Sequence, residues 1–365
     1  IHGSANHVCA ATLVSDIPPG SLKKGLDPRS PDKAIWYASY EEEFLGLTNN
    51  DTFEIISAED YFRWSKATGR TAIPSMNIFT VKRDSLGRPV RAKSRIVVLG
   101  NKDPVAWSKA DCYAPVVSLP IVRLLTALAV LNKRTLKQGD CKNAFVQADL
   151  PPDEDTVVRP PIGCPFSPPG TFWRLKKSLY GLRRAPRHWY QLISAILKSI
   201  GLTQCQHDAC LFFGCLLPDK PPVYIVIYVD DFVYFSADPD VEKAFEIQLS
   251  QRIKVDFMGT AEWFIGIKFD WSFSADGEVA CRLSQEAYAN VIVDAMGLGD
   301  ASVSPLMTPF RSDYPIDTVS HQDMTAEARA PLIAKMRSWC GMLNWLSQGT
   351  RLDITTMVSL LASHQ

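Results

Sequence analysis

Two strongly β-forming runs flank a pair of adjacent carboxylates, and this arrangement limits the possible folds more than any other feature of the chain. Residues 223–229 and 232–235 are rich in valine, isoleucine and aromatic side chains, and Asp230 and Asp231 lie between them. So short a separation predicts a tight antiparallel hairpin. Adjacent carboxylates repel each other and are disfavoured within strands. The pair therefore indicates either a polar turn or a site for a hard divalent cation with oxygen ligands.

A third carboxylate, Asp140, follows a short stretch at residues 135–139 that we interpret as a strand. If this strand pairs beside the predicted hairpin, three carboxylates converge. Two cations held about 3.5–4 Å apart by such a set can stabilise both the attacking and the leaving oxygen of a phosphoryl transfer. We therefore expect metal-dependent phosphoryl-transfer chemistry if the strands meet.

The charge of the chain is zero on average but uneven along the sequence. The 365 residues include 39 Lys+Arg and 39 Asp+Glu, yet residues 82–109 sum to +6 and residues 171–200 to +7. Such basic windows suit contacts with nucleic-acid phosphates, and the second also carries Tyr180 and Trp189, which can stack on bases. The alternatives are a solvated strand face in the first window and, for Trp189, a position in the core, which we favour for that residue.

Composition excludes disorder, collagen and coiled coil, because 46% of the residues are hydrophobic and 21% are charged. No apolar run approaches the roughly 18–20 residues of a membrane span, so we expect no membrane partner. The chain begins with Ile1 and shows no signal peptide, so we expect it to be a piece of a longer protein. Nine cysteines without a C-x-x-C pair indicate free thiols. A zinc site is the weaker alternative, formed by Cys205, His207, Cys210 and Cys215.

The remaining pattern mixes helices and strands irregularly, which predicts the α+β class. Apolar spacing and capping residues predict helices at 34–47, 121–132, 186–200, 241–253, 285–296 and 331–347. Further strands are predicted at 73–80, 95–99, 263–271 and 279–283. Residues 1–32 and the proline-rich residues 151–170 lack periodicity and predict a linker and a loop.

Several motifs together resemble the reverse transcriptases of copia-type LTR retrotransposon Pol polyproteins. Three occur in the order and spacing of that family: 138–146 (QGDCKNAFV), 174–190 (RLKKSLYGLRRAPRHWY) and 228–231 (YVDD). Weaker similarity extends over residues 34–360, which is nearly the whole chain. The combination of motifs is specific, although a single motif would not be.

The resemblance implies a right-hand polymerase whose antiparallel palm sheet carries the catalytic carboxylates. The implied division is a linker-like segment at 1–32, fingers at 33–110 and 148–184, palm at 111–147 and 185–280, and a thumb or connection-like helical region at 281–365. Cys141 stands where the family usually has an aliphatic residue, which a buried cysteine can replace.

The same motifs imply a role for each site residue. Asp140, Asp230 and Asp231 would bind two Mg²⁺ ions, or Mn²⁺, with the main-chain carbonyl of Cys141 as a further ligand. The implied nucleotide-binding set is Lys93, Arg95, Ala144, Phe145, Tyr180 and Gly181. The implied nucleic-acid-binding set is Lys176, Lys177, Arg183, Arg184 and Arg187. Phe145 would exclude a 2′-OH by its bulk, and the alternative for this residue is core packing.

The function implied by the resemblance is RNA-directed DNA polymerisation. Its partners would be an RNA template, a DNA primer and product, dNTPs, and other Pol domains, with an integrase upstream and a ribonuclease H downstream. The expected location is the cytoplasm, in virus-like particles, or the nucleus. The alternative is a catalytically silent, retroelement-derived subunit that binds RNA or supports a partner. The presence of all three carboxylates favours the enzyme.

Overall fold

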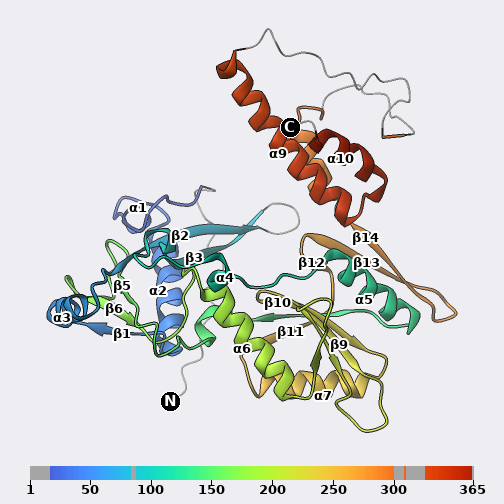
Figure 1. Cartoon of the computed structure of the whole chain (residues 1–365), viewed down its shortest axis with the longest axis horizontal. Helices are drawn as coiled ribbons and strands as arrows, with labels where there is room; N and C mark the ends of the chain where they lie inside the picture. Colours follow the sequence, from blue (N-terminus) through green and yellow to red (C-terminus); the bar gives the residue numbers. More distant parts are fainter. Residues whose placement is uncertain (1–16, 84–87, 300–307, 310–324, 364–365) are drawn as a thin grey trace. The chain divides into compact units, whose positions relative to one another are not determined.

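The computed structural model describes residues 17–83, 88–299, 308–309 and 325–363. The chain forms two compact units (Figure 1). The first unit comprises residues 1–116, 141–202 and 247–256, and the second comprises residues 117–140, 203–246 and 257–365. Among the described residues, no helix is both long enough and apolar enough to cross a membrane.

A five-stranded sheet with the order β1-β6-β5-β2-β3 lies at the centre of the first unit. Neighbouring strands are antiparallel except for β2 and β5. The strands are β1 Phe53–Ile56, β2 Ile73–Arg83, β3 Pro89–Val98, β5 Val157–Arg159 and β6 Phe172–Leu175. The strands predicted at 73–80 and 95–99 are confirmed as β2 and β3, and both are longer than predicted.

Helix α2 (Lys33–Asn49) supplies much of the core of the first unit and confirms the helix predicted at 34–47. It buries Trp36, Tyr40, Phe44 and Leu47, which recur every three or four residues and so share one face. The other helices of this unit are α1 Leu22–Gly25, α3 Ala58–Thr68, α4 Lys109–Cys112 and α6 Ala185–Ser199, with 3₁₀ turns at Gly100–Lys102 and Ala144–Gln147.

Part of the predicted linker belongs to the folded core. Ser21 caps α1 by accepting a hydrogen bond from the Lys24 backbone N–H. Leu22 is 3% exposed, and a Cβ at Gly25 would lie 2.7 Å from the Phe79 ring. The prediction was wrong for this stretch because two leucines, Leu22 and Leu26, in an otherwise polar segment are too few to establish a periodicity. The prediction for residues 1–16 lies outside the described residues.

A six-stranded sheet with the order β11-β4-β10-β9-β8-β7 carries the predicted hairpin. The strands are β4 Lys137–Cys141, β7 Thr203–Gln204, β8 Leu211–Gly214, β9 Val223–Tyr228, β10 Asp231–Ser236 and β11 Val255–Thr260. Strands β9 and β10 confirm the hairpin, and β4 confirms a strand at Asp140. Every residue of β10 after Asp231 is buried, so both faces of the sheet are covered there.

In the described residues, the rest of the second unit comprises a three-stranded sheet, several helices and a 3₁₀ turn at Leu352–Ile354. The sheet contains β12 Trp263–Phe264, β13 Ile267–Phe273 and β14 Val279–Ser284. The strand predicted at 263–271 is interrupted because Ile265 and Gly266 have φ values of 45° and 75°. The helices are α5 Leu119–Leu131, α7 Pro239–Ser250, which ends at the boundary of the first unit, α8 Glu286–Ala295, α9 Ala326–Gly349 and α10 Thr355–Ser363.

Candidate active site

Two of the predicted catalytic carboxylates face each other across β4 and β10. The strands are antiparallel, and their register places Asp140 directly opposite Asp231. Opposed residues in an antiparallel pair direct their side chains to the same face, with Cα atoms about 4.5–5.5 Å apart. Both residues are half-buried. The strand at Asp140 therefore lies beside the hairpin, as predicted.

The third carboxylate, Asp230, lies in the turn between β9 and β10. Tyr228 pairs with Asp231, so the two turn residues are Val229 and Asp230 rather than the predicted Asp230 and Asp231. Val229 has a φ of 56°, a left-handed conformation that is disfavoured for a β-branched residue. Such strain costs on the order of 1–3 kcal/mol and is concentrated at functional sites. The strain therefore supports a role for this turn beyond connecting two strands.

Gly139 allows β4 and the Phe232 ring of β10 to approach closely beside Asp140. The two residues are opposed in the register, and a Cβ at position 139 would overlap the Phe232 ring. A slip of one residue would move this contact and turn Asp140 to the other face of the sheet. The glycine and the phenylalanine therefore help to fix the register that opposes the two carboxylates.

A buried ion network, which the sequence analysis missed, links both strands to α7. Glu242 of α7 is fully buried and accepts a hydrogen bond from the Ser236 backbone N–H at 3.1 Å. The Glu242 carboxylate also pairs with Arg134 at 2.8 Å and with Lys137 at 3.1 Å. One turn further along α7, Glu246 pairs with Lys137 at 2.9 Å. The i,i+4 spacing of the two glutamates was visible in the sequence, but their partners were not.

The carboxylates at β4 and β10 are of the kind that binds a hard divalent cation. Asp140 and Asp231 share one face of the sheet, Asp230 adjoins them in the turn, and like charges this close are stabilised by a cation. Across the described ranges, however, no three His, Cys, Asp or Glu side chains are grouped as a metal site. The Cys and His residues of the zinc alternative are likewise not grouped in these ranges. Consistently, Cys210 is buried, and burial raises the pKa of its thiol to about 12.

The predicted triphosphate-binding cations lie together in the first unit. Residues of β3 alternate between buried and half-exposed positions, so Lys93 and Arg95 share the more exposed face. The half-buried Glu43 accepts a hydrogen bond from the Ile96 backbone N–H at 3.1 Å, and burial raises the pKa of Glu43. Burial, together with the charge of Arg95, lowers the pKa of Lys93. The cation of Arg95 lies 5.4 Å from the centre of the Tyr180 ring.

The turn at Tyr180 and Gly181 is held against β3. The Val98 backbone N–H donates to the Tyr180 carbonyl at 2.7 Å. Gly181 has a φ of 89°, and a Cβ there would overlap the Val98 carbonyl oxygen, so only glycine fits. Ser178, two residues before Tyr180, is fully buried, and its hydroxyl lies 2.8 Å from Nδ1 of His188. These contacts fix the turn before any ligand binds.

Ala144 and Phe145 lie in the 3₁₀ turn Ala144–Gln147. Ala144 is 1% exposed, whereas Phe145 is partly buried against the core of the first unit. The Phe145 ring also meets the Tyr180 ring edge-on, with centroids 4.8 Å apart. Phe145 therefore combines core packing with a contact to the Tyr180 turn. Trp189 is 1% exposed, which confirms the core position favoured for it.

The five cations predicted to bind nucleic acid all have partners within the first unit. Lys176 pairs with Asp51 at 2.9 Å, Lys177 with Asp149 at 3.9 Å, and Arg184 with the buried Glu154. The other two donate hydrogen bonds to main-chain carbonyls. Arg183 donates to the carbonyl of Gly100, and Arg187 donates to the carbonyl of Ala110. The acidic partners lie far away in the sequence, so the basic window is less positive in the folded protein than it is along the chain.

Opposed carboxylates beside a strained hairpin turn, together with cations and aromatic residues on a separate unit, are features expected of a nucleic-acid polymerase. The family described as reverse transcriptase (RNA-dependent DNA polymerase) matches residues 59–311. The chain belongs to this family, and the resemblance to copia-type retrotransposon reverse transcriptases is confirmed.

The curated proteins to which the chain is similar include three retrotransposon polyproteins. The Pol polyprotein from transposon TNT 1-94 of Nicotiana tabacum is 25% identical over 353 residues, which cover 96% of this chain and 25% of the relative. The Pol polyprotein from transposon RE1 of Arabidopsis thaliana is 29% identical over 347 residues, which cover 94% of this chain and 22% of the relative. The Ty1-LR2 Gag-Pol polyprotein of Saccharomyces cerevisiae is 25% identical over 240 residues, which cover 66% of this chain and 13% of the relative. The chain thus spans a quarter or less of each relative's length.

The solved structures that match include two of a foamy viral protease-reverse transcriptase with double-stranded DNA. The dRH form has a TM-score of 0.43 at 13% identity and covers 90% of this chain and 44% of that chain. The second structure has a TM-score of 0.41 at 13% identity, and the match covers 90% of this chain and 52% of that chain. At these scores the likeness is weak.

Proposed function

We propose that this chain catalyses RNA-directed DNA synthesis, in which a primer 3′-OH attacks the α-phosphate of a dNTP paired with an RNA template. The observation that carries the proposal is the register that opposes Asp140 to Asp231, beside the strained turn that holds Asp230. In a chain of the reverse transcriptase family, this arrangement supports a site for phosphoryl transfer.

The carboxylates Asp140, Asp230 and Asp231, with the main-chain carbonyl of Cys141, would hold two Mg²⁺ ions, for which Mn²⁺ can substitute. When bound, the cations neutralise the charge that develops on the reacting oxygens. The contribution of the chain is to hold the carboxylates in a fixed register on two paired strands. This is positioning and electrostatics, with no covalent step on the protein.

The nucleotide would be bound by residues of the first unit. Arg95 suits forked contacts with phosphate oxygens, and Lys93 acts as a point charge on the same strand face. The rigid turn at Tyr180 and Gly181 would contact the nucleotide or the template, together with the 3₁₀ turn that begins at Ala144. The tight hydrogen bonding of the turn supports this role because a fixed surface loses little entropy on binding.

The proposal includes a right-hand architecture of fingers, palm and thumb, with the sheet of β4 and β10 as the palm. The substrates would be an RNA template, a DNA primer and dNTPs. The relatives are Pol polyproteins, of which the chain spans a quarter or less, so we also propose an integrase upstream and a ribonuclease H downstream.

Nucleotide incorporation on homopolymer RNA templates tests the proposed function. With Mg²⁺, the purified chain should add dTTP to oligo(dT) on poly(rA) and dGTP to oligo(dG) on poly(rC). The template, and not the nucleotide supplied, should determine what is incorporated. Incorporation without a template would contradict the proposal. Tight primer–template binding with no incorporation under any condition would favour the catalytically silent RNA-binding subunit.

Replacing Phe145 with alanine should weaken discrimination against ribonucleotides. The side chain is partly buried and its ring contacts Tyr180, so its removal opens space beside the turn. We expect the ratio of dNTP to rNTP incorporation to fall about 10-fold or more. Phe145→Tyr keeps the bulk of the ring and should keep the ratio. If discrimination is unchanged in Phe145→Ala, this residue is only part of the core.

Template binding should depend on salt although the chain has no net charge. Exposed cations of the proposed nucleic-acid-binding set, such as Lys176, would displace counterions from the nucleic-acid backbone. We expect affinity for a primer–template to fall about 10-fold or more between about 50 and 200 mM salt. The logarithmic slope should be shallower by about 1 for Lys176→Ala. A flat salt dependence in the wild type would contradict an electrostatic template contact.

A further inference from the structure

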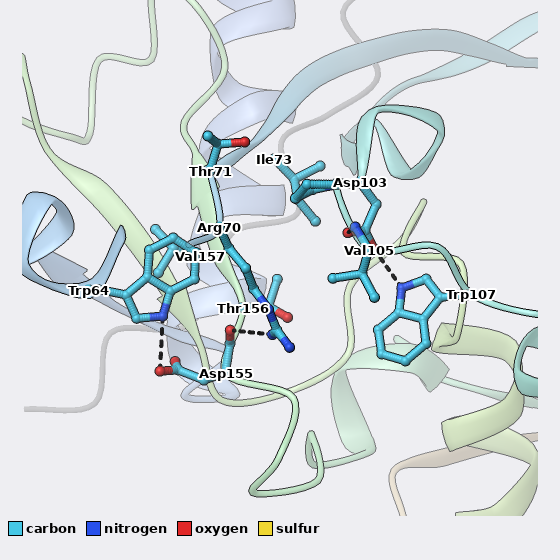
Figure 2. Close-up of a pocket in the computed structure, with 11 residues that line it drawn as sticks. Trp64, Arg70, Thr71, Ile73, Asp103, Val105, Trp107, Asp155, Thr156 and Val157 are labelled. Atoms are coloured by element: carbon cyan, nitrogen blue, oxygen red, sulfur yellow. Dashed lines mark hydrogen bonds between the residues drawn. The ribbon is translucent and has the colours of Figure 1, made fainter. Parts of the chain in front are cut away.

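The first unit contains a pocket between two tryptophans that the proposed chemistry does not use. It is a shallow depression open to solvent and not an enclosed cavity. Figure 2 shows Trp64 on one side, Trp107 on the other, and Arg70 extending between them. Asp103 and Asp155 also line it. Half-buried aromatic walls around a cation are the features of a site for a planar, anionic ligand.

Trp64 of α3 is fixed at its edge. Its indole N–H donates to the Asp155 carboxylate at 3.0 Å. That carboxylate also accepts two hydrogen bonds from the Arg174 guanidinium, both at 2.7 Å. The negative charge of Asp155 is therefore paired, and its position is set by a forked contact. The Trp64 ring is thus held in place while remaining half-buried.

Trp107 is fixed in a similar way. Its indole N–H donates to the Asp103 carboxylate at 2.8 Å. The guanidinium of Arg184 lies over the ring, 4.6 Å from its centre, and is itself paired with the buried Glu154. One side of the Trp107 ring is thereby covered by a cation that is anchored in the core. Both tryptophans are ordered in the free protein, so a ligand would bind with little loss of side-chain entropy.

Arg70 is the cation that this arrangement leaves available. In the described part of the chain it makes no ion pair, and its guanidinium donates one hydrogen bond, to the Asp155 main-chain carbonyl at 3.5 Å. Asp103 does not pair with Arg70. The two carboxylate oxygens of Asp103 accept hydrogen bonds from the Val105 backbone N–H at 2.9 Å and from the Trp107 indole N–H. A half-buried guanidinium without a carboxylate is suited to a phosphate.

We propose that this pocket binds one nucleotide of single-stranded nucleic acid, namely an unpaired template nucleotide that has not yet been copied. The base lies against the indole rings of Trp64 and Trp107, and its phosphate lies on Arg70. This inference rests on the proposed function, because it takes the single strand to be the template of the polymerase. Stacking on an aromatic side chain changes affinity by roughly 5- to 150-fold per base, and every base has a face that can stack.

Affinity for primer–templates with different 5′ template overhangs tests the proposal. Fluorescence anisotropy would compare a single-nucleotide overhang with an overhang of about eight nucleotides, the span of a typical single-strand site. The wild type should bind the long overhang about 10-fold more tightly. Trp64→Ala and Arg70→Ala should each lose most of this preference and keep the wild-type affinity for the short overhang.

Matched controls lie on the same helix, α3. Phe62 is an exposed aromatic residue and Arg63 an exposed arginine paired with Glu59 and Asp60. Phe62→Ala and Arg63→Ala should keep the preference for the long overhang. If Trp64→Ala fails to fold, Trp64→Phe and Trp64→Leu replace it. The phenylalanine keeps an aromatic face and should retain more of the preference than leucine does.

Two results would overturn the proposal. One is an unchanged preference for the long overhang in both Trp64→Ala and Arg70→Ala. The other is binding of free AMP, lost in Trp64→Ala, as tightly as the overhang binds, which would make the ligand a free nucleotide rather than a strand. The proposed function can fail separately, because primer extension on the short-overhang template does not require the pocket. A preference for the long overhang without primer extension would support this binding site and contradict the proposed polymerase activity.

Discussion

Replacing Asp140 or Asp231 with asparagine should lower the rate of primer extension about 1000-fold or more. Each substitution keeps the size of the side chain but removes a negative charge from the opposed pair. The stabilisation lost with a metal ion in phosphoryl transfer is several kcal/mol, and about 1.4 kcal/mol corresponds to a tenfold change in rate. We expect the same loss for Asp230→Asn. Single-nucleotide addition at saturating primer–template measures the effect.

Asp276→Asn is the matched control for these variants. Asp276 lies between β13 and β14, in a turn of a different hairpin of the second unit. This variant should extend primers at the wild-type rate. The unfolding temperature of every variant is measured alongside, so that a loss of extension is scored only for folded protein. Near-wild-type extension by both Asp140→Asn and Asp231→Asn would exclude this pair as the catalytic site.

Replacing Glu242 with glutamine should destabilise the protein by about 3 kcal/mol. The fully buried carboxylate balances Arg134 and Lys137, whose side chains are 29% and 30% exposed. The substitution leaves Arg134 with a neutral amide, while Lys137 keeps its pair with Glu246. The partial exposure of the two cations and this remaining pair place the loss at the lower end of the range for buried pairs. The free energy of unfolding in urea measures the change.

Glu278→Gln tests the same chemistry at the surface. Glu278 pairs with Lys133, and both side chains are more than half exposed, at 63% and 57%. This variant should lose less than about 1 kcal/mol. Equal stability losses for Glu242→Gln and Glu278→Gln would mean that the buried network contributes no more than a surface pair.

The local parts of the site could be predicted from the sequence. The β-forming runs around Asp230 and Asp231 determine the hairpin because they are short, apolar and separated by two residues. The same reasoning placed Asp140 on a strand. The turn itself was shifted by one residue, because a valine at a left-handed φ has no signal in the sequence. The register came from a long-range fit of Gly139 to Phe232, which only the fold reveals.

Charge was the least predictable property of the site. The basic window at 171–200 appeared free to bind nucleic acid, but Lys176 and Arg184 pair with acids from distant segments. Pairing of this kind depends on which strands become neighbours, and not on spacing along the chain. For the same reason, the partners of Glu242 and the fixed tryptophans of the pocket were missed.

The most direct test of the central claim is a metal-addition experiment on a preformed complex. The chain, poly(rA) and oligo(dT) are combined with dTTP and a chelator, and binding is verified before excess Mg²⁺ is added. The primer should stay at its original length until Mg²⁺ arrives, then lengthen, and stop lengthening when chelator is restored. A bound primer that remains unextended at every concentration of Mg²⁺ and Mn²⁺ would contradict the account.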